Sequence, residues 1–263
     1  MENFEFKEKY SIDDLLKIME ILRAPGGCPW DAEQTHESIK KSFIEETYEV
    51  IEAIDNDDPT LMREELGDLL WQVVFHAELE REAGRATVDD VIHDICSKLV
   101  HRHPHVFGNV VAETSDVVLS NWEKIKTEEK NRNTVTSKLQ SVPPSLPALM
   151  RAQKVGKRAP FFDFPDADAV IFKLEEETNE LKDAITGGNA AEIDEEFGDL
   201  LFTAVSLARK LGIDAEESLT RATLKFIARF SKLEQVVLES GKDVTLLSMT
   251  ELDEIWDGIK HKM

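Results

Sequence analysis

Residues 43–77 read FIEETYEVIEAIDNDDPTLMREELGDLLWQVVFHA, and residues 174–208 read LEEETNELKDAITGGNAAEIDEEFGDLLFTAVSLA. Offset by 131 positions, the two stretches match at 14 of 35 residues without a gap. Each stretch contains an EExxE motif, then a turn, then an ExxD motif. A repeat period of this length indicates two copies of one module rather than a solenoid of short repeats.

The paired acidic motifs predict two metal sites. Residues three apart on a helix project from one face, with Cβ atoms ~5–6 Å apart. The turns at 55–59 and 186–189 fold each copy into a helical hairpin, so four carboxylates are expected to face one another. Such a group is strongly repulsive without a cation, and oxygen ligands suit Mg²⁺ first and Mn²⁺ second. The carboxylates are Glu46, Glu49, Glu65 and Asp68 in the first copy, and Glu177, Glu180, Glu196 and Asp199 in the second.

Basic and aromatic residues follow each hairpin in the same order. A KxxxR pattern, Lys98 with Arg102 or Lys225 with Arg229, precedes a WxxIK pattern that begins at Trp122 or Trp256. Arginine binds phosphate oxygens in a bidentate manner, and tryptophan stacks on a nucleobase. The alternatives are surface ion pairs for the basic residues and a packing role for the tryptophan.

Composition limits the class of protein. The chain has 263 residues, with 53 acidic against 31 basic side chains and a formal net charge of −22. Such a charge disfavours general nucleic-acid binding. No run of 18 apolar residues and no signal-peptide pattern occurs, so we expect no membrane association and a cytoplasmic protein. Cys28 and Cys96 are interpreted as reduced thiols.

Helical periodicity dominates the chain and predicts an all-α fold. We expect residues 1–130 to form one module, 131–147 a polar, proline-containing linker, and 148–263 a second module. Short β-like patches such as 106–111 remain an alternative. Helices are expected at about 12–22, 36–54, 59–82, 88–103, 148–159, 166–186, 190–211, 214–240 and 251–260, with Ser11, Thr35, Asp58, Thr87 and Thr250 as N-caps.

Two other patterns have structural interpretations. His101, His103 and His105 alternate beside a proline that breaks the helix, which favours loop packing or hydrogen bonding over metal binding. Gly67 and Gly198 lie inside the ExxD motifs, where a close helix approach is expected.

Three further segments complete a family pattern: GCPWD at 27–31 with a following QT, RHPHVF at 102–107 and LPALMRAQK at 146–154. Together with the paired acidic motifs they resemble the MazG family of nucleoside triphosphate pyrophosphohydrolases, over almost the whole chain. The resemblance implies two tandem four-helix-bundle-like modules, usually assembled as homodimers. It also implies Mg²⁺-dependent cleavage of NTPs or dNTPs into a monophosphate and pyrophosphate, as nucleotide-pool housecleaning.

The resemblance also assigns roles to residues. The eight carboxylates become metal ligands, and the expected reaction is in-line attack of water on the α-phosphorus. Glu192 stands where some relatives are expected to carry lysine. The proposed nucleotide contacts are Lys173, Lys225, Arg229, Trp256 and Lys260, and the candidate bases or supporting groups are Glu176 and Glu45.

Both halves keep the full acidic set, and we favour the second as catalytic because its chain ends soon after Trp256 and Lys260. The first half is then structural, a regulatory nucleotide site or a second active site. The alternatives for the whole chain are a non-catalytic helical regulator that binds nucleotide or metal, and a dUTPase-like pyrimidine-specific hydrolase. A regulator would bind nucleotide without releasing pyrophosphate. A dUTPase-like enzyme would act on dUTP alone.

Overall fold

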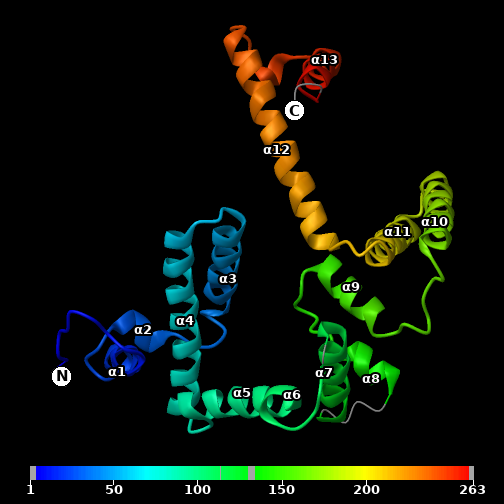
Figure 1. Cartoon of the computed structure of the whole chain (residues 1–263). Helices are drawn as coiled ribbons and strands as arrows, with labels where there is room; N and C mark the ends of the chain where they lie inside the picture. Colours follow the sequence, from blue (N-terminus) through cyan, green and yellow to red (C-terminus); the bar gives the residue numbers. More distant parts are fainter. Residues whose placement is uncertain (1–3, 113, 130–133, 261–263) are drawn as a thin grey trace. The chain divides into compact units, whose positions relative to one another are not determined.

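The computed structural model describes residues 4–112, 114–129 and 134–260, and every regular element in these ranges is a helix (Figure 1). The expected all-α class is therefore confirmed, and the patch at 106–111 contains no strand. The chain divides into two compact units, residues 1–126 and 127–263, which are treated separately below. In the described residues, no helix is both long and apolar enough to cross a membrane.

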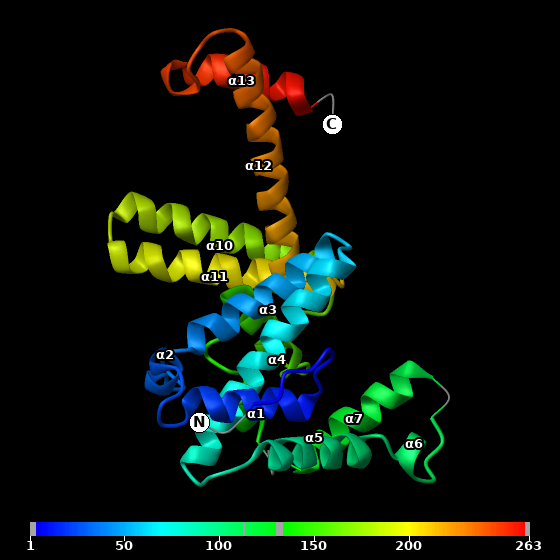
Figure 2. The same cartoon turned by 90° about the vertical axis from the view of Figure 1, so that its left-hand side faces the viewer.

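Unit 1 is built around the hairpin of α3 and α4, with α1 packed against α4 and α2 packed against α1. Figure 2 shows α5 leaving the end of α4 across the hairpin axis instead of running along it. The helices are α1 (Ile12–Arg23), α2 (Pro29–Glu33), α3 (Lys40–Asp55), α4 (Pro59–Glu82), α5 (Val88–Arg102), α6 (Pro104–Phe107) and α7 (Ser115–Glu129).

Local capping fixes most helix starts in unit 1. Ser11 and Thr87 form capping boxes with Asp14 and Asp90, and the Asp58 side chain accepts hydrogen bonds from the first-turn amides of α4. These three caps agree with the sequence prediction. Thr35 was the wrong cap, because α3 begins only at Lys40.

The segment before α3 has a different local structure from the expected helix. The Thr35 backbone N–H donates to Ser38 Oγ over 2.9 Å, and Thr35 Oγ1 accepts from the Ser38 backbone N–H over 3.2 Å, which closes a turn instead of a helix. The His36 ring then stacks on His76 of α4, with ring centroids 5.0 Å apart. These contacts anchor the segment to α4 before α3 begins.

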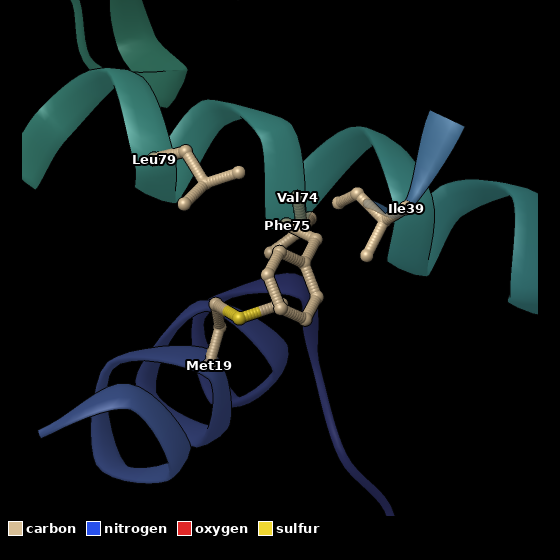
Figure 3. Packing of buried hydrophobic residues seen from close by; sticks show 5 residues of the cluster. All are labelled: Met19, Ile39, Val74, Phe75 and Leu79. Carbon is tan, nitrogen blue, oxygen red and sulfur yellow. The ribbon is translucent and has the colours of Figure 1, made fainter. Parts of the chain in front are cut away.

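The core of unit 1 lies between α1 and α4. Figure 3 shows Met19 of α1 and Phe75 of α4 pointing toward each other, with Ile39, Val74 and Leu79 around them. Met19 and Phe75 are almost fully buried. The Arg23 guanidinium lies 5.2 Å from the Phe75 ring centroid and pairs with Glu82, so it closes the end of this core.

Unit 2 repeats the hairpin with α10 and α11, and α9 packs against both α11 and α12. In Figures 1 and 2, α12 runs away from the base of this hairpin, and α13 folds back against α12. Leu233, Val237 and Ile259 form the small core between those two helices. The helices are α8 (Val135–Gln140), α9 (Ala148–Lys157), α10 (Ala167–Gly187), α11 (Ala190–Lys210), α12 (Ala215–Glu239), the 3₁₀ turn η1 (Val244–Leu246) and α13 (Met249–Lys260).

Two sequence expectations in unit 2 differ from the structure. Residues 135–140 of the expected linker form a helix, which Thr134 caps by accepting from the Ser137 amide. Ser248, rather than Thr250, caps α13, because its Oγ accepts from the Glu251 amide over 3.3 Å while Glu251 Oε2 accepts from the Ser248 amide. Positions 131–133 of the expected linker lie outside the described residues.

The two hairpins close in comparable ways. The first turn places Asp57 at φ 50°, and the second places Gly188 at φ 70°, so each loop uses one left-handed residue. Several apolar side chains of the hairpin helices remain exposed in the chain itself. Ile51 and Ile54 of α3 are examples, at 44% and 59% exposure. The hairpins therefore do not bury all of their apolar surface within the described part of their own units.

Candidate active site

The first carboxylate cluster lies between the two arms of the α3–α4 hairpin. Glu46 and Glu49 come from α3, and Glu65 comes from α4. One oxygen of each lies within 4.8 Å of the others, as a shared ligand site requires. Asp68, one turn along α4, adds its negative charge to the field around Glu46 but does not join this converging group.

Burial and mutual repulsion perturb the first cluster. Glu65 is only 8% exposed, and its Oε2 atom is buried without a hydrogen-bond partner among the described residues. Burial raises the pKa of Glu65, and the charge of Glu49 raises it further. Burial likewise raises the pKa of Glu46, helped by a hydrogen bond with Glu49. Without a cation, the cluster therefore tends to retain protons.

The second cluster lies between α10 and α11, with one ligand from the first arm and two from the second. Oxygens of Glu177, Glu196 and Asp199 lie within 4.8 Å of one another. Glu177 is 4% exposed. Burial raises the pKa of Glu196, and the charges of Glu180, Glu177 and Asp199 add to the shift. Glu180, the fourth expected ligand, adds its negative charge to the field around Glu196, but it is not a member of the converging group.

The donor set of both clusters fits a divalent cation. Every converging atom is a carboxylate oxygen, which is the ligand type of Mg²⁺, Mn²⁺ and Ca²⁺ rather than of softer metals. The buried and unpaired Glu65 Oε2 is an acceptor that a cation would satisfy. The sequence predicted four facing carboxylates in each hairpin, and three of the four converge in each, without Asp68 in the first and without Glu180 in the second.

Lys173, Glu176 and Glu45 lie beside the clusters. The Lys173 ammonium contacts Glu176 Oε1 at 2.6 Å and Glu177 Oε1 at 2.9 Å. Glu176 is exposed and held by this ion pair, whereas Glu45, its counterpart in the first repeat, is exposed on α3. The i,i+4 spacing of Lys173 and Glu177 is the sequence signal for this contact, although Lys173 was predicted only as a nucleotide contact.

The expected nucleotide contacts lie on α12 and α13. Trp256 packs on Phe226, with ring centroids 5.3 Å apart, and Lys260 pairs with Asp257 at 3.0 Å. The Nε atom of Arg229 is buried without a hydrogen-bond partner among the described residues, and Lys225 is exposed. In unit 2, α12 runs away from the α10–α11 hairpin (Figure 2), and α13 packs on α12.

Unit 1 arranges the corresponding residues differently. The Trp122 ring has the Lys126 ammonium 4.4 Å from its centroid and the Arg102 guanidinium at 5.3 Å. Two cations thus lie over this tryptophan. Among the described residues of unit 2, no lysine or arginine lies over the ring of Trp256. Phe226, whose ring supports Trp256, was not identified from the sequence, although it precedes Phe230 by one helical turn.

Two minor sequence expectations have different outcomes. Gly67 and Gly198 have open space where a Cβ atom would stand, so the expected close helix approach was wrong. His103 bonds through Nδ1 with the Leu99 carbonyl at 2.6 Å, and its ring lies 5.6 Å from that of His105. These contacts agree with the loop-packing interpretation of the histidines.

Comparison with known proteins adds a family to this geometry. The family model described as "MazG nucleotide pyrophosphohydrolase domain" matches residues 34–107 and 167–233. The chain belongs to the MazG family. Both matched segments contain a full set of four carboxylates, while Trp122, Trp256 and Lys260 lie beyond them.

Several proteins similar to this MazG chain carry descriptive names. A Thermotoga maritima protein named "Nucleoside triphosphate pyrophosphohydrolase/pyrophosphatase MazG" is 45% identical over 250 residues, covering 94% of this chain and 95% of its own. The Escherichia coli K12 "Nucleoside triphosphate pyrophosphohydrolase" is 45% identical over 258 residues, which cover 95% of this chain and 97% of the relative. A Mycobacterium tuberculosis protein of the same name is 33% identical over 226 residues, which cover 85% of this chain and 58% of the relative.

Proposed function

We propose that this chain hydrolyses nucleoside triphosphates to nucleoside monophosphates and pyrophosphate, with Mg²⁺ as its preferred divalent cation. The observation that carries the proposal is the pair of converging three-carboxylate groups, one in each MazG segment. The names of relatives that match the chain almost from end to end support the same reaction. A role in clearing the nucleotide pool is consistent with this chemistry.

The protein side of the mechanism is binding and positioning. The carboxylates of Glu177, Glu196 and Asp199 would hold the cation, with Glu180 able to join them. A bound divalent cation neutralises phosphate charge and lowers the pKa of water. Lys225 and Arg229 would bind the triphosphate through charge-assisted hydrogen bonds and fix its orientation.

Glu176 and its counterpart Glu45 are candidates for directing the attacking water. Each directly precedes the first converging glutamate of its cluster, so it can accept a proton or a hydrogen bond at the edge of the site. Glu176 first has to part from the Lys173 ammonium, which it contacts at 2.6 Å. A bound triphosphate provides other oxygens for that ammonium.

Exposed apolar side chains on α12 and α5 support a homodimer. The exposed apolar side chains of α12 recur at helical spacing, and α5 carries a similar row in unit 1. Exposed rows of this kind are typical of subunit interfaces. We therefore propose that pairing of two chains covers them. The residues are Leu219, Leu224, Phe226, Ile227 and Phe230 on α12, and Val91, Ile92, Ile95 and Leu99 on α5.

The second module is the proposed catalytic one. The Trp122 ring in the first module already has Lys126 and Arg102 over it, which compete with a nucleobase for its π-face. Trp256 rests on Phe226, and this contact leaves the tryptophan half-exposed. Stacking of a base on Trp256 therefore needs no displacement of a cation among the described residues.

A product assay tests the proposal. Purified protein with Mg²⁺ is given each common NTP and dNTP, and nucleotide and pyrophosphate are measured separately. We expect equal amounts of monophosphate and pyrophosphate, both lost on chelation. Diphosphate with orthophosphate would place the cleavage at the γ-phosphate and contradict the proposal. Tight binding without turnover would instead support a regulator, and turnover of dUTP alone a pyrimidine-specific enzyme.

A further inference from the structure

The second carboxylate cluster contains a cation of its own. Lys173 Nζ lies 2.6 Å from Glu176 Oε1, 2.9 Å from Glu177 Oε1 and 3.8 Å from Glu180 Oε2. The Glu177 side chain is 6% exposed, so its pairing with the ammonium is shielded from water. Lys173 itself keeps a third of its side chain exposed, which leaves a path for the ammonium to move outward.

The first cluster lacks this cation. Ser42 occupies the position that matches Lys173 in the repeat. Within the described part of unit 1, no lysine or arginine forms an ion pair with the cluster glutamates. Among the described residues, the second cluster therefore contains a lysine in contact with its carboxylates, whereas the first does not.

The ammonium coincides with a difference in ligand arrangement. In the first cluster, Glu49 belongs to the group whose oxygens converge within 4.8 Å. Its counterpart Glu180 is outside the converging group of the second cluster and has an oxygen 3.8 Å from Lys173 Nζ. Two repeat positions therefore differ in whether they converge, Glu49 with Glu180 and Asp68 with Asp199, and Glu180 is the one of these that lies beside the lysine.

We propose that Lys173 is an intramolecular counter-cation of the second cluster, which a divalent cation must displace, and that it lowers the affinity of this cluster for divalent cations. The proposal rests on the metal-binding role assigned to the carboxylates under the proposed function. A unit charge and a divalent ion cannot share these oxygens without strong repulsion. The flexible lysine stem allows the ammonium to move away while it stays tethered to α10.

The displaced ammonium remains one helical turn before Glu177, within reach of an incoming anion. Phosphate oxygens of a triphosphate can then replace the lost carboxylate partners. Binding of the metal and binding of the nucleotide are therefore expected to strengthen each other at the second cluster. The first cluster has Ser42 at this position and is not expected to show this effect.

The test measures Mn²⁺ binding directly, from the electron paramagnetic resonance signal of free Mn²⁺. The full chain carries E46Q and E65Q, so that binding reports on the second cluster. Adding K173S, which copies Ser42, should tighten Mn²⁺ binding roughly fivefold, as expected for the loss of partly exposed ion pairs. K173M, which keeps the apolar stem, should do the same. Circular dichroism checks that each variant folds.

A matched control removes the same charge elsewhere on α10. Lys182 contacts Asn179 Oδ1 at 3.3 Å and has no ion pair with the cluster among the described residues. K182S should change Mn²⁺ affinity by less than about twofold, because an exposed charge farther along the helix is screened by solvent. An equal effect of both substitutions would mean that net charge alone changes the Mn²⁺ affinity, and it would overturn the proposal.

A reciprocal graft completes the experiment. With the second cluster disabled by E180Q and E196Q, the substitution S42K should weaken Mn²⁺ binding at the first cluster. If the K173S chain still binds Mn²⁺ but with unchanged or weaker affinity, the proposed role of Lys173 is overturned, while the metal assignment stands. Absence of Mn²⁺ binding in both single-cluster chains would overturn the metal assignment itself, and with it the proposed function.

Discussion

The rings of Phe226 and Trp256 lie 5.3 Å apart at a tilt of 48°, so the tryptophan expected to contact nucleotide also packs α13 onto α12. Replacement of Trp256 by alanine should therefore lower both stability, by about 2 kcal/mol for a half-buried aromatic side chain, and nucleotide affinity, by roughly tenfold. Denaturant unfolding and equilibrium dialysis with a non-hydrolysable triphosphate measure the two effects.

Replacement of Trp256 by phenylalanine separates them. Phenylalanine keeps an aromatic contact with Phe226 and should retain most of the stability, while its smaller ring stacks less well on a base. Full nucleotide affinity in the alanine variant would leave Trp256 with a packing role only. The alanine variant of Trp122 is the matched comparison, because Lys126 and Arg102 already lie over that ring.

The raised pKa of Glu65 predicts how metal-free protein responds to pH. Its folded-state pKa lies above the ordinary value of 4.5, so its stabilising contribution is complete below that value and is lost as pH rises through the folded pKa. Without metal at neutral pH, Glu65→Gln should therefore unfold at a higher temperature than wild type. The difference should disappear below pH 4.5.

Addition of Mg²⁺ should reverse that order, because only the wild-type cluster gains the full binding energy of the cation. Glu64→Gln is the control, since it removes a neighbouring but exposed carboxylate from the same helix. Thermal melts with and without chelator make the comparison. A Glu65→Gln variant that melts lower than wild type without metal would contradict the assignment of repulsion at this site.

The contact of Asp163 with Arg209 predicts a stability effect outside the clusters. Asp163 accepts hydrogen bonds from Arg209 and pairs with Lys210 at 2.7 Å, and its side chain is 10% exposed. Asp163→Asn leaves two cations short of a partner and should cost about 2 kcal/mol, less than a fully buried pair. The control Glu217→Gln, in an exposed pair with Arg221, should change stability by less than about 0.5 kcal/mol.

The same contact has a pH signature. The hydrogen bonds from Arg209 have the largest effect on Asp163. Together with the contact from Lys210, they hold the pKa of Asp163 well below its usual range. The stabilisation is therefore present above the unfolded-state value of 3.8 and is lost as pH falls through the folded-state value. The difference in urea midpoint between wild type and Asp163→Asn should shrink below pH 3.8. A constant difference at all pH values would mean that packing, not charge, accounts for the loss.

Helix starts were predictable where contacts within a few residues decide them. Ser11, Asp58 and Thr87 cap their helices because the amides they satisfy follow within three residues. Thr35 failed as a cap because contacts with distant residues, including the stacking of His36 on His76, hold the preceding segment in another conformation. Such contacts have no local signature.

The carboxylate clusters were predictable because i,i+3 spacing and a short turn determine which side chains meet. The relation of α12 to the clusters was not, because it depends on how helices far apart in sequence pack. Lys225 and Arg229 have the right chemistry for phosphate, yet their helix runs away from the hairpin of their own unit (Figure 1). Exposed apolar residues such as Ile54 likewise reflect surfaces that the described chain does not cover by itself.

The exposed apolar row of α12 predicts the oligomeric state. If two chains pair through this face, Ile227→Glu places a charge in the interface and should convert the dimer to a monomer at micromolar concentration. Lys232→Glu changes an exposed polar position on the same helix and should leave the dimer intact. Light scattering coupled to size exclusion should give about twice 29.8 kDa for wild type. A monomeric wild-type chain would contradict the proposed pairing.

The two modules can be assigned by disabling one cluster at a time. Glu196→Gln removes a converging oxygen ligand from the second cluster, and Glu65→Gln removes its counterpart from the first. If the second module is catalytic, Glu196→Gln should lower kcat/KM by at least about a hundredfold, since even supporting groups around a metal are worth ten- to a hundredfold. Glu65→Gln should then leave most of the pyrophosphate release intact. The opposite result would assign catalysis to the first module, while equal partial losses would mean that both modules turn over. Unchanged turnover with both substitutions combined would mean that neither cluster holds the catalytic cation.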